Sequence, residues 1–351
     1  MIRPTLVVIC GLLGACGART GVPSGRDPTD AAFDTASSDS GDSGDSGDSG
    51  ACAAELVARD SNGAGALAAA EGVAVWGTSD GRVQRHDGSG TALLATAPGG
   101  ITSIAMLGDR VYFTYTGTLA YVSDAGPVVT VATSLGLPFA LEGDSSTFYL
   151  LDRGQGIAAG RLLRIDGTVV KVLLDGLDIP TGLAIGGDSV YVAAHLALLG
   201  GGGTFGPLVR VPKGGGPATV LATGLHQPSS LAFHDGRVFF IEQVDSTSSY
   251  PGAVRSIGEA GGVLTTHASI EAALGLDLAV DPTGIYWTAL STSEGTLHRT
   301  PLIGGPSTVI ATTPKVQFTY VRTTTTSIYW TVSWLKGNPP SDPVSVRKLC
   351  K

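Results

Sequence analysis

Cysteine is nearly missing from this chain of 351 residues. Cys10, Cys16 and Cys52 lie near its beginning, Cys350 is its next-to-last residue, and none occurs from residue 53 to residue 349. Charged residues make up 15% of the chain, and no run of Lys and Arg is present, which argues against a nucleic-acid partner. The sequence also lacks H-x-x-x-H, P-loop and C-x-x-C motifs. It therefore predicts no catalytic residue, no metal and no cofactor.

Glycine and proline, by contrast, are plentiful. The 51 Gly and 19 Pro, together with 43% hydrophobic residues and only two Met, favour many short strands joined by tight turns over helices. The chain is long enough for one large domain or two of medium size. Its formal net charge of −8 is uneven, because residues 17–50 carry seven Asp against two Arg.

The N-terminal "MIRPTLVVICGLLGACG" has the pattern of a targeting segment. Arg3 precedes an apolar stretch, Leu6 to Leu13, that is too short to span a bilayer, as in a secretory signal peptide. The "LGAC" ending at Cys16 resembles the bacterial lipobox. This resemblance implies a signal peptide over residues 1–15 and a lipid anchor on Cys16. Gly17 stands where inner-membrane retention signals usually have Asp, so the expected location is the outer membrane or the cell surface.

Residues 16–50 are predicted to be a disordered linker. The run "SSDSGDSGDSGDSG" contains almost no apolar residue, so it cannot compensate for the entropy lost on ordering. A Gly/Ser-rich chain of ~35 residues has an end-to-end distance of ~30–35 Å. We therefore expect a solvated tether between the lipid and a domain over residues 51–351.

That domain contains seven repeats. An apolar, usually aromatic strand recurs at intervals of 37 to 48 residues, as in "GVAVW", "DRVYF", "TGIYW" and "TSIYW". Short apolar strands such as "SIAML" and "DLAVD" precede these segments, and a third and a fourth strand follow. The repeat markers are Ala74, Tyr112, Tyr149, Tyr191, Phe239, Tyr286 and Tyr329.

Four short strands in each of seven repeats predict an all-β, seven-bladed β-propeller of four-stranded antiparallel blades. The repeats resemble those of NHL, TolB-type and YWTD propellers. "IYWT" at residues 285–288 and 328–331 is similar to the YWTD blade motif, although Ala289 and Val332 replace its Asp.

The last repeat has only three strands, and residues 53–58 carry a fourth-strand pattern with no third strand before it. We therefore predict that the N-terminal strand completes the C-terminal blade and closes the ring. The same alignment places Cys52 and Cys350 on either side of one hairpin turn, close enough for a disulfide. Cys10 is expected to leave with the signal peptide and Cys16 to be acylated, so Cys52 and Cys350 are the remaining pair for an oxidising compartment.

Arginine recurs in the third strand of most blades. We interpret this series as a blade-packing device that the repeats share by descent, in preference to a ring of anion ligands. Its members are Arg85, Arg164, Arg210, Arg255, Arg299 and Arg347.

Candidate ligand-binding residues lie toward the loop face, by which we mean the face built from the loops that join strands two and three and that join successive blades. The strand-two to strand-three segments of blades four, five and seven are long, and long insertions on one face are where function tends to lie. The candidates are Asp152, Asp178, His195, His226, Glu242 and Gln243.

We interpret the protein as a monomeric, envelope-anchored binding or scaffold module for a protein or a glycan, without catalysis. The alternative is a propeller hydrolase or lyase with a small-molecule site. A similarity to streptogramin lyases, which are also seven-bladed, would imply a His/Glu constellation; His195, His226 and Glu242 supply the residue types, although the sequence offers no matching motif. Calcium-dependent propeller lactonases are disfavoured, because the chain has only Asn62 and Asn338.

Overall fold

The computed structural model describes residues 54–60, 63–123, 126–144, 147–156, 158–195, 205–243, 251–271, 273–314, 316–334 and 345–351. All of them belong to one compact unit, Cys52–Lys351. The predictions for Cys16, Cys52, the linker and most of the three long insertions lie outside the described residues. Within the described ranges, no helix is long and apolar enough to cross a membrane.

Twenty-eight described strands form seven four-stranded antiparallel sheets, which confirms the seven-bladed β-propeller. The strands of blades one to three are β2 (Ala64–Ala70), β3 (Val73–Thr78), β4 (Arg82–His86), β5 (Thr91–Thr96); β6 (Ile101–Leu107), β7 (Arg110–Tyr115), β8 (Thr118–Ser123), β9 (Val129–Ala132); β10 (Pro138–Asp144), β11 (Thr147–Asp152), β12 (Gly160–Asp166) and β13 (Val169–Leu177).

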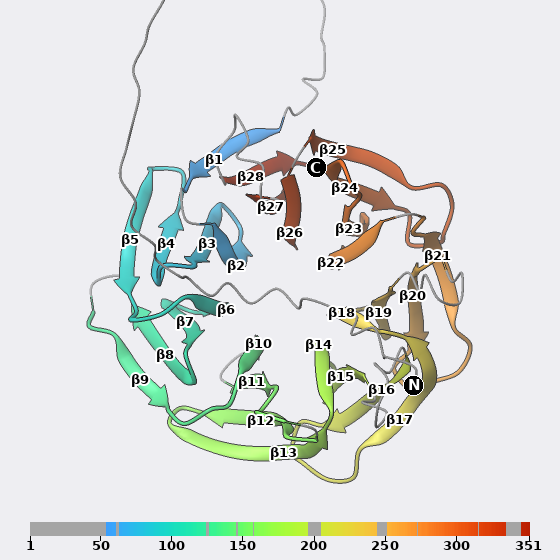
Figure 1. Ribbon diagram of the computed structural model, residues 1–351, viewed down its shortest axis with the longest axis horizontal. Coiled ribbons are helices and arrows are strands. Elements are labelled where there is room, and N and C mark those ends of the chain that lie inside the picture. The colour runs from blue at the N-terminus through green and yellow to red at the C-terminus, as the bar shows by residue number, and fades with distance from the viewer. Residues whose placement is uncertain are drawn as a thin grey trace, which may run out of the picture. The chain divides into compact units, whose positions relative to one another are not determined.

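The strands of blades four to six are β14 (Ile179–Gly186), β15 (Ser189–His195), β16 (Phe205–Pro212), β17 (Thr219–His226); β18 (Ser229–His234), β19 (Arg237–Glu242), β20 (Ala253–Gly258), β21 (Thr265–Ser269); β22 (Leu274–Asp281), β23 (Gly284–Leu290), β24 (Glu294–Thr300) and β25 (Thr308–Pro314). The first strands of the blades lie around the centre of the ring, and the fourth strands lie at the periphery (Figure 1).

Blade seven closes the ring with strands from both ends of the sequence. It contains β26 (Val316–Thr323), β27 (Ser327–Trp334) and β28 (Ser345–Cys350), and its outer strand is β1 (Glu55–Arg59). β1 pairs antiparallel with β28, so that Glu55 lies opposite Lys348 and Leu56 opposite Arg347. The predicted ring closure is therefore confirmed, with the strand beginning at residue 55 in the described part of the chain.

The core lies between the blades. Seven buried apolar clusters fill the interfaces between neighbouring blades, including the one between blades seven and one, where Trp76 packs with Tyr329 and Val346. Burial of each large apolar side chain contributes about 1.5–3 kcal/mol relative to exposure. Since every sheet covers two neighbours, the alternating apolar residues of each strand serve both interfaces.

Strand register corrects two details of the repeat alignment. In blades two to seven, the aromatic marker is the third residue of the second strand. The third residue of β3 is Val75, which lies opposite Ala68, so the marker of blade one is Val75 and the prediction of Ala74 was wrong by one residue. In the arginine series, Arg164 and Arg210 lie opposite the markers of their blades, whereas Arg255 and Arg347 are displaced by one residue. Because successive side chains in a strand point to opposite faces, the displaced arginines serve the other face of their sheets.

The packing role predicted for the arginines is visible in two blades. Arg164 Nη1 donates to the carbonyl oxygen of Lys213 in blade four at 2.8 Å, and Arg210 Nη1 donates to that of Glu259 in blade five at 3.2 Å. These bonds join each blade to the next.

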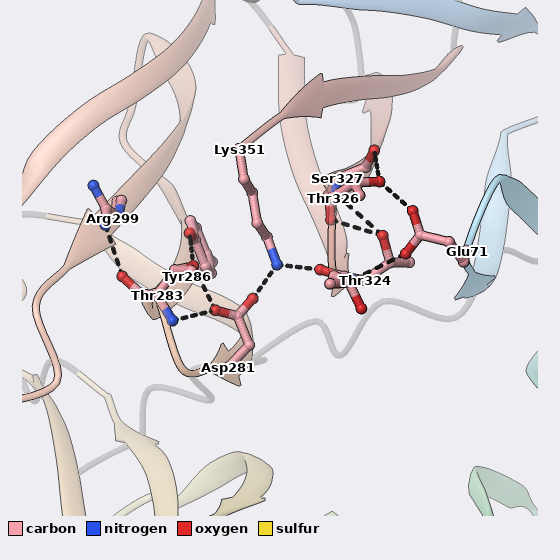
Figure 2. A network of polar contacts seen from close by, with 10 residues as sticks. Glu71, Asp281, Thr283, Tyr286, Arg299, Thr324, Thr326, Ser327 and Lys351 are labelled. Atoms are coloured by element: carbon pink, nitrogen blue, oxygen red, sulfur yellow. Dashed lines mark hydrogen bonds and ion pairs between the residues drawn. The ribbon is translucent and has the colours of Figure 1, made fainter.

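A network of polar contacts also joins blade seven to its neighbours (Figure 2). It lies on the turn face, by which we mean the face where the first strand of each blade turns into the second. The ammonium group of Lys351 pairs with Asp281 of blade six and with the carbonyl oxygen of Thr324. On the other side of the same turn, Glu71 of blade one accepts hydrogen bonds from the Thr325 N–H and the Thr326 hydroxyl. The inner turn of blade seven is thus held by both of its neighbours.

Candidate functional site

Asp152, a predicted ligand-binding residue, is fully buried at the end of β11 and is engaged by the protein. Its carboxylate accepts hydrogen bonds from the backbone N–H groups of Gly136 (3.0 Å), Leu137 (2.7 Å) and Gly154 (3.0 Å), and it pairs with Arg161. Burial acts to raise the pKa of Asp152, but these donors outweigh it and hold the pKa below its ordinary value. Asp152 is therefore a structural anchor for the segment that enters blade three.

Glu242 has the same role in blade five. It ends β19 with 1% of its surface exposed, accepts the His226 N–H at 2.9 Å, and pairs with Arg255 Nη1 at 2.8 Å. The structure thus brings two members of the predicted His/Glu constellation into contact, but through the backbone of His226. Its imidazole ring instead packs against Phe205, with ring centroids 4.7 Å apart.

Three other candidates, His195, Gln243 and Asp178, lie on the loop face. His195 ends β15, and burial together with the charge of Arg153 lowers its pKa, against hydrogen bonds to the backbone of Gln227 and Pro228 that act to raise it. Gln243 joins blades five and six, because its Nε2 donates to Ser229 Oγ at 2.9 Å and to the Gly275 carbonyl oxygen at 2.6 Å.

Asp178 lies just before β14 and is partly buried. His195 and Gln243 contact the blade that follows their own, so these candidates are distributed along the rim of the ring.

The first strands share a β-bulge near the loop face. Each of the seven inner strands shows a register shift against its second strand, for example between Ile101 and Ser103 in β6 and between Pro180 and Gly182 in β14. A bulge re-aims a side chain, and here the bulged Thr102 and Thr181 donate to proline carbonyl oxygens of the following blade, Pro138 and Pro228.

Below the bulges, the inner strands repeat one small residue. Opposite each marker, or Val75 in blade one, five blades place alanine: Ala68, Ala105, Ala184, Ala232 and Ala279. The two exceptions are Glu142 in blade three, opposite Tyr149, and Arg322 in blade seven, opposite Tyr329. One acid and one base therefore project from positions where the other blades carry a methyl group.

Arg322 and a third residue, Asp277 of β22, form a bonded pair. Arg322 Nη1 lies 2.7 Å from Asp277 Oδ2, which also accepts the Val321 N–H at 3.0 Å. The other carboxylate oxygen of Asp277 accepts the Ser230 hydroxyl at 2.6 Å. Burial alone would lower the pKa of Arg322, but Asp277 and Glu142 raise it above its ordinary value, so this residue is a permanent cation.

Glu142 is in a different state. Burial raises its pKa, the negative charge of Asp277 raises it further, and the charge of Arg322 opposes both. Among the described residues it accepts no hydrogen bond. Glu142 and Arg322 line a cavity of about 220 Å³ whose other walls come from β2, β6 and β10 and include Ala68, Ala69 and Ala105.

Glu142, Asp277 and Arg322, which lie on first strands around the central channel of the ring, are called the channel cluster below. The cluster can bind and orient a charged group, and it offers few ligands for a metal. In the described part of the chain, no group of three or more His, Cys, Asp and Glu side chains is placed to hold a metal ion. A second cavity, of about 520 Å³, lies on the turn face beside Lys351, Asp281 and His234.

Sequence reasoning missed Glu142, Asp277 and Arg322, although a signal was present. The segments "SIAML", "GLAIG", "SLAFH" and "DLAVD" share an apolar residue followed by alanine, and the corresponding segments of blades three and seven read "ALEGD" and "YVRTT". Charged replacements within an otherwise constant inner strand identify the two blades whose channel positions differ.

Comparison with protein-family models and with curated proteins finds no match. Among solved structures, the chain is similar to one from a nidogen/laminin complex, with a TM-score of 0.52, 16% identity, and coverage of 69% of this chain and 93% of that one.

It is similar to a computationally designed protein, Ika8, with a TM-score of 0.53, 14% identity, and coverage of 84% and 98%. It is also similar to a prolyl endopeptidase, with a TM-score of 0.57 and 11% identity, over 84% of this chain and 50% of that one. At these identities the likeness shows the repeat-type β-propeller fold alone.

Proposed function

We propose that this protein is a binding module of the cell envelope, anchored by a lipid on Cys16 and the linker over residues 16–50, and that it binds a protein or a glycan through its loop face. The loop-face part of the proposal is supported by the described residues. The anchor is supported by the lipobox-like "LGAC" of the sequence.

The observation that carries the proposal is a set of exposed apolar side chains on the loop face. Leu137, Ile179 and Leu274 lie at or just before the first residues of β10, β14 and β22 and are 45%, 42% and 51% exposed. Phe205, the first residue of β16, is 41% exposed. Exposed large apolar side chains beside polar groups such as Gln243 are found on surfaces that bind a partner.

The strand ends that flank the long insertions lie on the same face. β15 ends at His195 and β16 begins at Phe205, and β19 ends at Glu242 and β20 begins at Ala253. The insertion of blade four therefore begins after His195, which lies opposite the exposed Ile179, and ends at the exposed Phe205.

The enzyme alternative needs Glu242 as an accessible carboxylate. The His226 N–H and the Arg255 guanidinium occupy both of its oxygens, and the side chain is 1% exposed. This engagement supports binding in preference to catalysis.

Site-specific photo-crosslinking of the full chain in intact cells tests the proposal. A photoreactive residue at Ile179 or Phe205 is expected to give an adduct with the same partner, because both positions lie on the loop face. Val169 and Val220, which are 64% and 57% exposed on the outer strands β13 and β17, are the matched controls. Absence of adducts from both loop-face positions, or equal adducts from all four positions, would contradict loop-face binding.

A further inference from the structure

The cavity in the central channel has walls suited to a small apolar group. Ala68, Ala69 and Ala105 present methyl groups, and Ile104 and Met106 add apolar surface, around a volume of about 220 Å³. Such a volume has room for several water molecules or a small organic group. Only Glu142 and Arg322 bring charge to this wall.

The charges of the channel cluster do not balance within the described residues. Arg322 is joined to Asp277 Oδ2 at 2.7 Å, the same oxygen accepts the Val321 N–H, and Oδ1 accepts the Ser230 hydroxyl, so the pair is neutral and both carboxylate oxygens are engaged. Glu142 is the charge left over. A partly buried carboxylate that receives no hydrogen bond from the described residues is unfavourable unless a proton or a cation neutralises it.

We propose that this cavity binds a small organic cation, a primary ammonium group on a short apolar chain, with the Glu142 carboxylate as its counter-ion. The ammonium group supplies three N–H donors to a carboxylate that otherwise has none. The alanine walls surround the hydrocarbon part. This binding site is separate from the loop face, and it does not depend on the partner-binding function proposed above.

The same cluster argues against two other ligands. An anion at Arg322 would face the carboxylates of Glu142 and Asp277, and like charges at close range are costly. A divalent metal ion such as Ca²⁺ takes six to eight oxygen ligands, whereas the walls here are mostly methyl groups and Asp277 is already paired with Arg322. Glu142 with an apolar wall is therefore best matched by an organic cation.

Calorimetric titration of the full chain with n-butylamine at neutral pH tests the proposal, with n-butanol and butyrate as neutral and anionic probes of the same chain length. We expect butylammonium to bind at least tenfold more tightly than either. Glu142→Gln is expected to weaken that binding at least tenfold, and Glu142→Asp, which keeps the carboxylate, to weaken it less. Ala69→Leu fills the cavity without changing its charge, and is expected to weaken binding as much as Glu142→Gln.

Ala232→Leu is the matched control, because Ala232 is another partly buried alanine of a first strand and does not line this cavity. Thermal unfolding of each variant establishes that it is folded. Butylammonium binding no tighter than butanol, or binding that survives both Glu142→Gln and Ala69→Leu, would overturn the proposal. Loss with Glu142→Gln but not with Ala69→Leu would also overturn it, because it would indicate attraction to charge without occupation of the cavity.

Discussion

Removal of the Asp152 carboxylate is the most direct test of whether this residue is a structural anchor or a ligand-binding group. In Asp152→Ala, the N–H groups of Gly136, Leu137 and Gly154 lose their acceptor. Each orphaned buried donor costs about 1–3 kcal/mol. Arg161 is 37% exposed on its side chain and recovers hydration, so it adds little. We therefore expect a loss of about 3–5 kcal/mol in the free energy of unfolding, in the range found when one member of a buried ion pair is removed.

The assay is urea unfolding of the full chain, followed by circular dichroism. Asp166→Ala is the control, since Asp166 pairs with Arg164 at 2.7 Å but is 44% exposed on its side chain, and exposed pairs contribute about 0–1 kcal/mol. Asp152→Asn keeps an acceptor oxygen and should fall between the two. If Asp152→Ala loses less than about 1 kcal/mol, the anchoring role is wrong and Asp152 returns as a ligand candidate.

Three further predictions follow from the ends of the chain and from the channel. The mature protein should carry a Cys52–Cys350 disulfide, because β1 begins at Glu55, three residues after Cys52, and Glu55 lies opposite Lys348, two residues before Cys350. Alkylation of both thiols without reduction, measured by mass spectrometry, would disprove the pairing; loss of the bond in Cys350→Ser should cost about 2–5 kcal/mol. Metabolic labelling with an alkyne fatty acid should mark the protein, persist in Cys10→Ser and disappear in Cys16→Ser; persistence in Cys16→Ser would exclude the anchor. Burial and the charge of Asp277 raise the pKa of Glu142, although the charge of Arg322 opposes them, so the folded state favours the protonated form of Glu142. The stability that protonated Glu142 contributes is therefore fully present below the ordinary carboxyl pKa of about 4.3 and is lost as the pH rises through the raised pKa. The Glu142→Gln variant should therefore become more stable relative to the parent protein as the pH rises from 4 to 8, by about 1.4 kcal/mol for each unit by which the pKa is raised. A difference in melting temperature between the two proteins that stays constant over this pH range would contradict the prediction.

The fold could be read from the sequence because a propeller repeats its pattern. Each marker lies in the second strand of one blade, so the number of markers gives the number of blades. The partial repeats at the two ends of the domain together make one blade, and this predicts the pairing of β1 with β28. One-residue errors, as at Ala74 and Arg255, arose where neighbouring positions are both compatible with a strand. Only cross-strand hydrogen bonds fix the register in such cases.

The candidate site could be predicted far less well. The sequence predicts Asp152 and Glu242 as ligand candidates because they are polar residues near the expected rim of the ring, but a strand end near a neighbouring blade is also where backbone N–H groups need acceptors. The sequence does not show which donors will converge on a carboxylate. Glu142 and Arg322 lie 180 positions apart in the sequence, and only the closure of the ring places both on the wall of one cavity.

A repeat protein offers its own comparison set, and departures from the repeat carry information that single positions do not. Alanine at the inner-strand position of five blades shows that the fold is satisfied by a methyl group there, so a carboxylate at Glu142 is not required for packing. Arg322 is explained by Asp277, which holds it at 2.7 Å, but Glu142 has no such protein partner in the described residues. A carboxylate that the fold does not need, and to which the described residues donate no hydrogen bond, is a candidate ligand group, so Glu142 is the residue on which the cation proposed for the channel depends.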